Sequence, residues 1–158
     1  MTPGRASPMA RAHSAEHILN AVMQRCFGTG RSVEAHLGAK KSKCDYIVGR
    51  PLTEDDLRAI ETSVNEAIVR DLPVNTAIVP RVEAERAYDM GKVPSDVQTI
   101  RIVRIGDLDA IPCIGEHVER TSQIGRFRVR SMTMRDERTV RIRYVLEDRD
   151  LTHTEGSD

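Results

Sequence analysis

The sequence contains no tryptophan, and aromatic residues make up only 3% of its 158 residues. This scarcity argues against a nucleic-acid surface built from aromatic side chains that stack on bases. The sequence also has no run of about 18 consecutive apolar residues, which a membrane-spanning helix requires. Residues 1–10 lack the long apolar core of a secretory signal peptide. We therefore expect a protein without a membrane segment or a secretory leader.

Cysteine is also scarce, with three residues at widely separated positions, Cys26, Cys44 and Cys113. An odd and dispersed set does not suit the disulfide framework of a small secreted protein. We therefore expect the thiols to be reduced and the protein to be cytoplasmic.

The formal net charge is zero, but the charges are unevenly distributed along the chain. Residues 1–48 contain seven Lys and Arg against three acids, and residues 120–149 contain nine against four. Residues 49–119 have the opposite balance, eight against fourteen. Because local potential steers a polyanion, a net charge of zero does not exclude an RNA partner.

The length and the 39% hydrophobic content suit one domain with its own core. We expect an α+β fold in which an antiparallel sheet packs against an N-terminal helix and a second long helix. The domain is expected over residues 1–146, followed by a polar, flexible tail over residues 147–158. No internal repeat or linker interrupts this organisation.

Both helices have clear end signals in the sequence. Ser7 and Pro8 suit the N-cap and first position of a helix that ends at Gly28. Thr53 suits the N-cap of the second helix, with acidic residues in its first turn and Pro73 beyond its end. Period-two alternation or short apolar runs predict strands at residues 32–37, 43–48, 74–79, 99–105, 126–130 and 140–144, and a short helix at residues 82–90.

Two short motifs contain four side chains that suit one metal ion. His13 and His17 are four residues apart in the first helix, so both imidazoles lie on one face. Cys113 and His117 have the same spacing in a glycine-containing loop after Pro112. Thiolate and imidazole ligands favour zinc, so we expect one zinc ion per chain.

These motifs, followed by Thr121 and Ile124-Gly125, resemble the editing domain of alanyl-tRNA synthetase. The same core occurs in its free-standing relatives (the AlaX type) and in the second additional domain of threonyl-tRNA synthetase. The resemblance covers nearly the whole chain and includes Glu61 and Asn65 in the second helix. Because the sequence begins at the zinc helix, we expect it to belong with the short free-standing forms.

The resemblance implies a hydrolase that removes wrong amino acids from tRNA, chiefly serine or glycine from tRNA specific for alanine. The acceptor end of tRNA is then the expected partner. The family often has a threonine on the strand after the first helix, which contacts the substrate amino acid, and this sequence has none there. We expect the pocket to be formed by Ser32, Glu34, His36 and Thr121.

Arginines alternate with apolar residues in the last two predicted strands. If these strands pair, Arg126, Arg128 and Arg130 are expected to face Arg141 and Arg143, and like charges across strands destabilise a sheet. Contact with tRNA phosphates would relieve the repulsion, although a solvated sheet face explains the pattern equally well. A second basic group at the first hairpin consists of Lys40, Lys41 and Lys43.

Two other functions fit parts of the sequence. His13, Glu16 and His17 satisfy a short metallopeptidase pattern in which the glutamate acts as base, but a peptidase leaves Cys113 and His117 without a role. Alternatively, four protein ligands form the closed site typical of structural zinc. That reading predicts a tRNA-binding module that does not catalyse a reaction.

Overall fold

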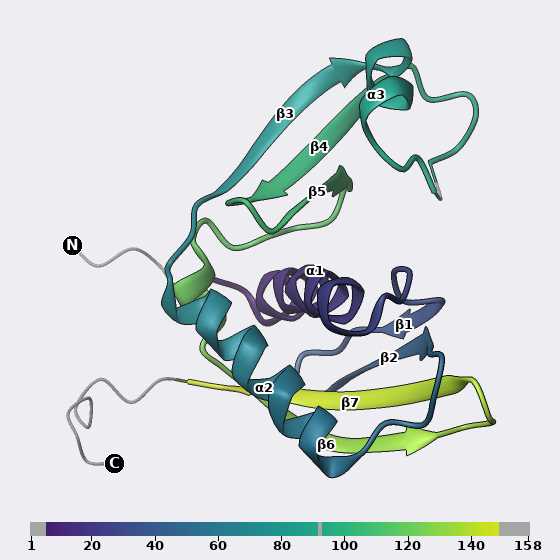
Figure 1. Ribbon diagram of the computed structural model, residues 1–158. Helices are drawn as coiled ribbons and strands as arrows, with labels where there is room; N and C mark the ends of the chain where they lie inside the picture. Colours follow the sequence, from purple (N-terminus) through teal and green to yellow (C-terminus); the bar gives the residue numbers. More distant parts are fainter. Residues whose placement is uncertain (1–5, 92, 149–158) are drawn as a thin grey trace.

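The structure, a computed structural model, describes residues 6–91 and 93–148. It has the expected α+β architecture, but with two antiparallel sheets instead of one. Figure 1 shows helix α1 (Pro8–Phe27) between the two sheets, with helix α2 (Glu54–Val69) crossing beside it. Among the described residues, no helix is long and apolar enough to cross a membrane.

The ends of α1 and α2 follow the local signals in the sequence. The Ser7 hydroxyl accepts a hydrogen bond from the Ala10 amide, and Gly28 ends α1 with a φ of 66°. Thr53 and Asp56 form a reciprocal capping box at the start of α2. Both capping arrangements satisfy amide groups that have no partner within the helix, so both predicted helix starts are confirmed.

The first sheet contains β1 (Glu34–His36), β2 (Ser42–Ile47), β6 (Arg126–Met134) and β7 (Thr139–Glu147), in the order β1-β2-β7-β6. One face of this sheet and the apolar faces of α1 and α2 form most of the main core. The Tyr144 hydroxyl donates to the carbonyl of Ala12, and the Tyr46 hydroxyl donates to Asn20 Oδ1. These buried hydrogen bonds fix the position of α1 on the sheet.

Helix α2 is bound to β6 by two polar side chains as well as by apolar packing. Asn65 exchanges two hydrogen bonds with the backbone of Phe127, at 2.8 and 2.9 Å. The Glu61 carboxylate accepts the Val129 amide at 2.8 Å. The strand has a register shift between Val129 and Ser131. Glu61 therefore satisfies a backbone donor next to an irregularity in the sheet.

The predicted alignment of arginines between β6 and β7 is wrong. Strands β6 and β7 do pair, but Arg126 lies opposite Glu147, Arg143 opposite Ser131 and Arg141 opposite Thr133. No arginine of β6 is therefore aligned with an arginine of β7 in this register. The expected pairs of arginines directly opposite each other are therefore not formed.

The second sheet contains β3 (Val74–Pro80), β4 (Thr99–Ile105) and β5 (Asp109–Pro112), in that order. Helix α3 (Arg81–Ala87) packs against it through a small separate core around Ala84, Ile100 and Ile102. The sequence did not predict β5 or the short 3-10 helix η1 (Thr121–Ile124). Strand β7 extends through Glu147, and the rest of the predicted tail, residues 149–158, lies outside the described residues.

Candidate metal centre

Four side chains from α1 and from the loop after β5 converge between the two sheets. Each offers one ligand atom, and these atoms all lie within 4.8 Å of one another. We call this group the His/Cys cluster; its members are His13, His17, Cys113 and His117. The sequence prediction that these four residues lie together is confirmed, and the cluster could hold a metal ion.

The histidine rings of the cluster pack against one another. The rings of His13 and His117 are stacked with centroids 4.3 Å apart, and His17 meets each of them edge-on. Cys113 Sγ lies 3.3 Å from His13 Nε2, close to the spacing of about 3.5 Å between two ligands of one tetrahedral ion. The cluster therefore has the convergence that a single ion requires.

Asp109 on β5 orients His17. Its Oδ2 lies 3.1 Å from His17 Nδ1, and Arg31 binds both carboxylate oxygens at 2.9 and 3.1 Å. A proton on Nδ1, donated to Asp109, leaves His17 Nε2 free as a ligand atom. Burial raises the pKa of Asp109, but the hydrogen bonds from His17 and Arg31 outweigh it and lower the pKa overall. Asp109 therefore remains a carboxylate.

Ser14, one residue after His13 on α1, orients His117. Its Oγ lies 2.9 Å from His117 Nδ1 and also accepts the Val118 amide at 3.0 Å. With a proton on Nδ1, His117 donates to the second lone pair of the same hydroxyl. His117 Nε2 is buried and is the one side-chain nitrogen or oxygen of this kind without a hydrogen-bond partner in the part of the chain described. A buried nitrogen without a partner is costly unless it binds something, so this atom suits a metal ligand.

The loop that contains Cys113 is held from β4. Arg101 donates through one nitrogen to the carbonyl of Cys113 at 3.0 Å and to that of Gly115 at 2.8 Å. Gly115 also touches His13 so closely that an added Cβ would lie 2.0 Å from its Cε1. Only glycine leaves room for that ring without a shift of the loop or of the histidine.

The electrostatics of the cluster favour a thiolate. Burial raises the pKa of Cys113, but the histidine rings beside the thiol lower it more, to about 3. For His17, burial lowers the pKa, whereas hydrogen bonds to Asp109 and Cys113 raise it, to about 9. Because the thiolate is the form of cysteine that binds metals, the cluster supplies Cys113 in the required state.

Glu16 lies beside the cluster, although its position on the helix did not guarantee this. Its Oε1 is 3.9 Å from His13 Nε2, and its Oε2 accepts hydrogen bonds from Asn20 and Ser32, both at 3.2 Å. Ser32 is therefore the predicted pocket residue that the structure brings next to the cluster. The Ser32 amide also donates to Asn20 Oδ1 at 3.2 Å.

The other three predicted pocket residues have different surroundings. Ala35 packs on the core side of the first sheet, so its neighbours Glu34 and His36 face the opposite side, away from α1. The Thr121 hydroxyl is fully buried and hydrogen-bonds the last turn of α2 and the Leu72 amide. The structure therefore does not bring Glu34, His36 or Thr121 to the cluster, because sheet pleating and the end of α2 determine their positions.

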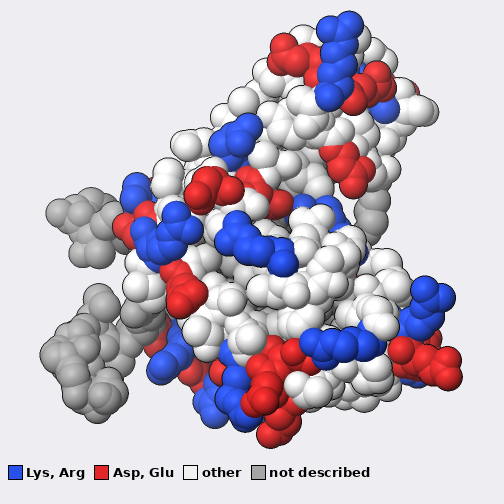
Figure 2. Space-filling model, in the orientation of Figure 1, with Lys and Arg blue, Asp and Glu red and all other residues white. Residues whose placement is uncertain are grey.

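The predicted basic residues do not form one continuous patch. Arg141 binds Asp45 through two nitrogens, at 2.8 and 3.0 Å, and Arg128 binds Glu147 at 2.9 Å. Figure 2 shows Lys and Arg interspersed with Asp and Glu on the face in view. Both contacts neutralise arginines that were expected to bind phosphate. The exposed basic side chains without a carboxylate partner among the described residues include Arg126, Arg130, Lys40 and Lys41.

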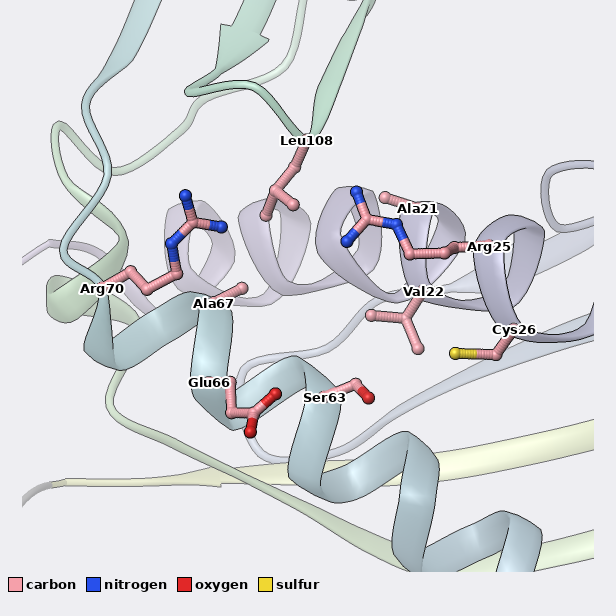
Figure 3. A pocket seen from close by; sticks show the side chains of 9 residues that line it. All are labelled: Ala21, Val22, Arg25, Cys26, Ser63, Glu66, Ala67, Arg70 and Leu108. Carbon is pink, nitrogen blue, oxygen red and sulfur yellow. The ribbon is translucent and has the colours of Figure 1, made fainter.

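A shallow groove lies on another side of α1, between α1 and α2. It is lined by Arg25, Cys26, Ala67, Arg70 and Leu108, with four further residues, and by no member of the cluster. Figure 3 shows Leu108 reaching toward both helices from the turn between β4 and β5. Leu108 packs on the main core. This contact holds the start of β5 against the helices, and with it the adjacent Asp109.

The sequence matches a known domain family and several alanine–tRNA ligases. Residues 100–143 match the family described as the threonyl and alanyl tRNA synthetase second additional domain. The chain is 33% identical to an alanine–tRNA ligase of Treponema denticola over 139 residues, 85% of its length. It is also 33% identical to that of Aeropyrum pernix over 144 residues, and 37% identical to that of Methanothrix thermoacetophila over 129. The chain is homologous to a segment of alanine–tRNA ligase.

The matches cover 88% of the chain for Aeropyrum pernix and 76% for Methanothrix thermoacetophila. In the opposite direction, the chain spans only 23%, 16% and 14% of the three alanine–tRNA ligases. The homology therefore concerns one segment of these enzymes. The family match itself includes β4, β5, the loop with Cys113 and His117, and β6.

Sequence reasoning missed the residues that support the cluster. Asp109 and Ser14 each orient a ligand, Arg101 holds the ligand loop, and Arg31 holds Asp109. Ser14 lies within the His-x-x-x-His motif, but a serine there gives no signal of its own. The others come from separate parts of the chain, and only the fold brings them to the cluster.

Proposed function

We propose that this chain binds one zinc ion at the His/Cys cluster and hydrolyses the ester bond of mischarged aminoacyl-tRNA. The expected substrates are seryl- or glycyl-tRNA specific for alanine. Support comes from the homology to a segment of alanine–tRNA ligase and from the resemblance to editing domains. The observation that carries the proposal is the buried, unpartnered His117 Nε2, which lies in a group of four converging ligand atoms.

The donor set supports zinc over magnesium or calcium. Three imidazoles and one thiolate are ligands that zinc accepts, whereas magnesium and calcium require oxygen. Carboxylate and hydroxyl partners hold two of the imidazoles, as is common for ligating histidines. The residues present therefore fit this ion.

The chain's own residues supply position and charge for the reaction. Asp109 and Ser14 hold His17 and His117 with the Nε2 atoms directed into the cluster, and Arg101 fixes the loop that contains Cys113. When bound, zinc lowers the pKa of a water molecule or polarises an ester carbonyl. Ser32, next to Glu16, remains our candidate for contact with the substrate amino acid.

A second candidate function is a zinc-stabilised tRNA-binding module without catalysis. The observation that favours it is the number of protein ligands, because four is typical of a structural zinc site. One observation supports the metallopeptidase alternative: Glu16 lies beside His13. It is less well supported because Cys113 and His117 complete the same cluster.

Deacylation of tRNA specific for alanine, charged with serine, glycine or alanine, tests the proposal. We expect the wild-type protein to release serine or glycine faster than alanine, and a Cys113→Ala variant to lose metal and activity together. Cys26→Ala, at an exposed position away from the cluster, is the matched control. Protein with stoichiometric zinc and tight tRNA binding that never exceeds the buffer rate would instead support the non-catalytic module.

The metal assignment has its own measurement. Elemental analysis should give about one zinc per chain in the wild type and in His36→Ala, and much less in His17→Ala. His36 is an exposed histidine outside the cluster, so His36→Ala shows whether loss of any histidine lowers the zinc content. Full zinc occupancy in His17→Ala would contradict the assignment.

A further inference from the structure

Glu16 is a carboxylate that two hydrogen bonds hold in place, with His13 as its nearest basic group. Its Oε2 accepts hydrogen bonds from Asn20 Nδ2 and Ser32 Oγ, each at 3.2 Å. Asn20 is buried and is itself fixed by the Tyr46 hydroxyl at 2.6 Å. The Glu16 side chain is 13% exposed, so it is largely desolvated but still open to a ligand. The surrounding residues therefore hold this carboxylate in one orientation.

The second oxygen of Glu16 is available. Its Oε1 lies 3.9 Å from His13 Nε2, which is too far for a hydrogen bond. Within residues 6–91 and 93–148, no donor forms a hydrogen bond to Oε1. The oxygen thus lies beside a ligand atom of the His/Cys cluster with its capacity to accept hydrogen bonds unused. Such an oxygen suits a donor that arrives with a substrate.

The charges around the cluster indicate what kind of donor this is. A dipositive ion with one thiolate and three neutral imidazoles keeps a net positive charge, and Arg31 offsets the charge of Asp109. An aminoacyl ester has an ammonium group one carbon away from the ester carbonyl. That ammonium would be repelled by the metal centre unless an anion lies close to it. Glu16, whose Oε1 lies 3.9 Å from His13 Nε2, is placed to do this.

We infer that Glu16 binds the α-ammonium group of the aminoacyl ester and so restricts the site to substrates with a free α-amino group. This inference rests on the proposed function and deepens it. N-acylated substrates, such as peptidyl-tRNA or N-formylated aminoacyl-tRNA, lack the charge and fill the space that the ammonium would occupy. Glu16 is then a specificity-determining residue, and Ser32 positions it.

The inference can be tested by binding, without hydrolysis. The probes are serine joined through an amide to 3′-amino-3′-deoxyadenosine, and the same compound with an acetylated amino group. We expect zinc-loaded wild-type protein to bind the free amine about tenfold to a hundredfold more tightly at pH 7. Glu16→Gln keeps the shape and the acceptor for Asn20 and Ser32, and it should reduce this preference to within about twofold.

Three further measurements make the test specific. Glu54→Gln, at an exposed position on α2, should keep the wild-type preference. Zinc content should be the same in Glu16→Gln as in the wild type, so that a lost preference is not lost metal. Ser32→Ala removes one of two hydrogen bonds to Glu16 and should reduce the preference in part.

Equal binding of the two probes by the wild-type protein would overturn the inference, as would an unchanged preference in Glu16→Gln. Glu16 would instead be a general base if Glu16→Gln keeps the preference but slows cleavage of seryl- and N-acetylseryl-tRNA equally. Failure of the proposed function would give a different result. The wild-type protein would then still bind the free amine more tightly than the acetylated probe, through Glu16, but it would not hydrolyse seryl-tRNA.

Discussion

The carboxylate of Asp109 joins His17 to Arg31, with Oδ2 3.1 Å from His17 Nδ1 and both oxygens bound by the guanidinium. Its side chain is only 6% exposed. A ligand histidine on α1 is thereby fixed by a strand of the second sheet. The metal centre therefore depends on the second sheet being in place, and not on α1 alone.

Asp109→Asn should weaken metal binding while leaving all four ligands in the chain. Asparagine keeps the shape but loses the negative charge that holds the Nδ1 proton of His17. We expect zinc affinity, measured by competition with a chelator, to fall about tenfold to a hundredfold. Asp107→Asn, at an exposed position two residues away, should change it little. Equal affinities for the wild type and Asp109→Asn would show that the hydrogen bond does not orient the ligand.

Gly115→Ala should displace His13 or the loop after β5. The new Cβ would lie 2.0 Å from His13 Cε1 and 2.2 Å from its Nδ1, far inside van der Waals contact. Reduced zinc content, by elemental analysis, is the expected result. Gly30→Ala is the matched control, because nothing lies within 4 Å of its added Cβ. If Gly115→Ala keeps full zinc occupancy, the loop can move without loss of the ligands.

The features that the sequence predicted correctly are mostly local. The ends of α1 and α2 depend on Ser7, Gly28 and Thr53, which act on neighbouring backbone groups. The cluster could also be predicted, because each ligand pair has a short fixed spacing and a residue type that binds metal. In both cases the chemistry of a few adjacent residues is sufficient.

The features that were missed depend on contacts between distant parts of the chain. Strand β5 has four residues, all of intermediate burial, so it has no alternating pattern, and its pairing with β4 is what defines it. Asp109 belongs to an acidic part of the sequence, where no sequence signal distinguishes it from a solvent-exposed carboxylate. The register of β6 against β7 depends on the irregularity near Val129, where Glu61 of α2 binds the backbone.

Asp45 should contribute stability that disappears in acid. Asp45 is buried. The hydrogen bond from Arg141 lowers its pKa, burial raises it, and the hydrogen bond from Arg135 lowers it further, so the pKa is lowered overall. A folded-state pKa below the unfolded value of about 3.9 means that the stabilisation is complete above that value. It is lost as the pH falls through the folded-state pKa.

The comparison of wild type with Asp45→Asn measures this contribution. We expect a difference in unfolding free energy of about 1–3 kcal/mol at pH 7, which shrinks as the pH falls below about 4. Acid also removes metal, but it does so in both proteins, so that effect largely cancels in the difference. Asp55→Asn, at an exposed position on α2, is the control. A difference that does not change between pH 7 and pH 3 would mean that the charge of Asp45 contributes nothing.

The arginines of the first sheet should differ in their effect on tRNA binding according to their partners. Arg126 and Arg130 are exposed and have no carboxylate partner among residues 6–91 and 93–148, so we propose that they bind phosphate. Replacing either by alanine should weaken tRNA binding similarly across sequences and reduce the salt-dependence slope by about one. Arg141 is held by Asp45, so Arg141→Ala should chiefly lower the unfolding free energy. Salt titrations of tRNA affinity and denaturant unfolding of the three variants provide the comparison. An unchanged slope in Arg126→Ala and Arg130→Ala would mean that these arginines are only solvated and do not bind phosphate. A reduced slope in Arg141→Ala alone would mean that Arg141 binds phosphate and that Arg126 and Arg130 do not.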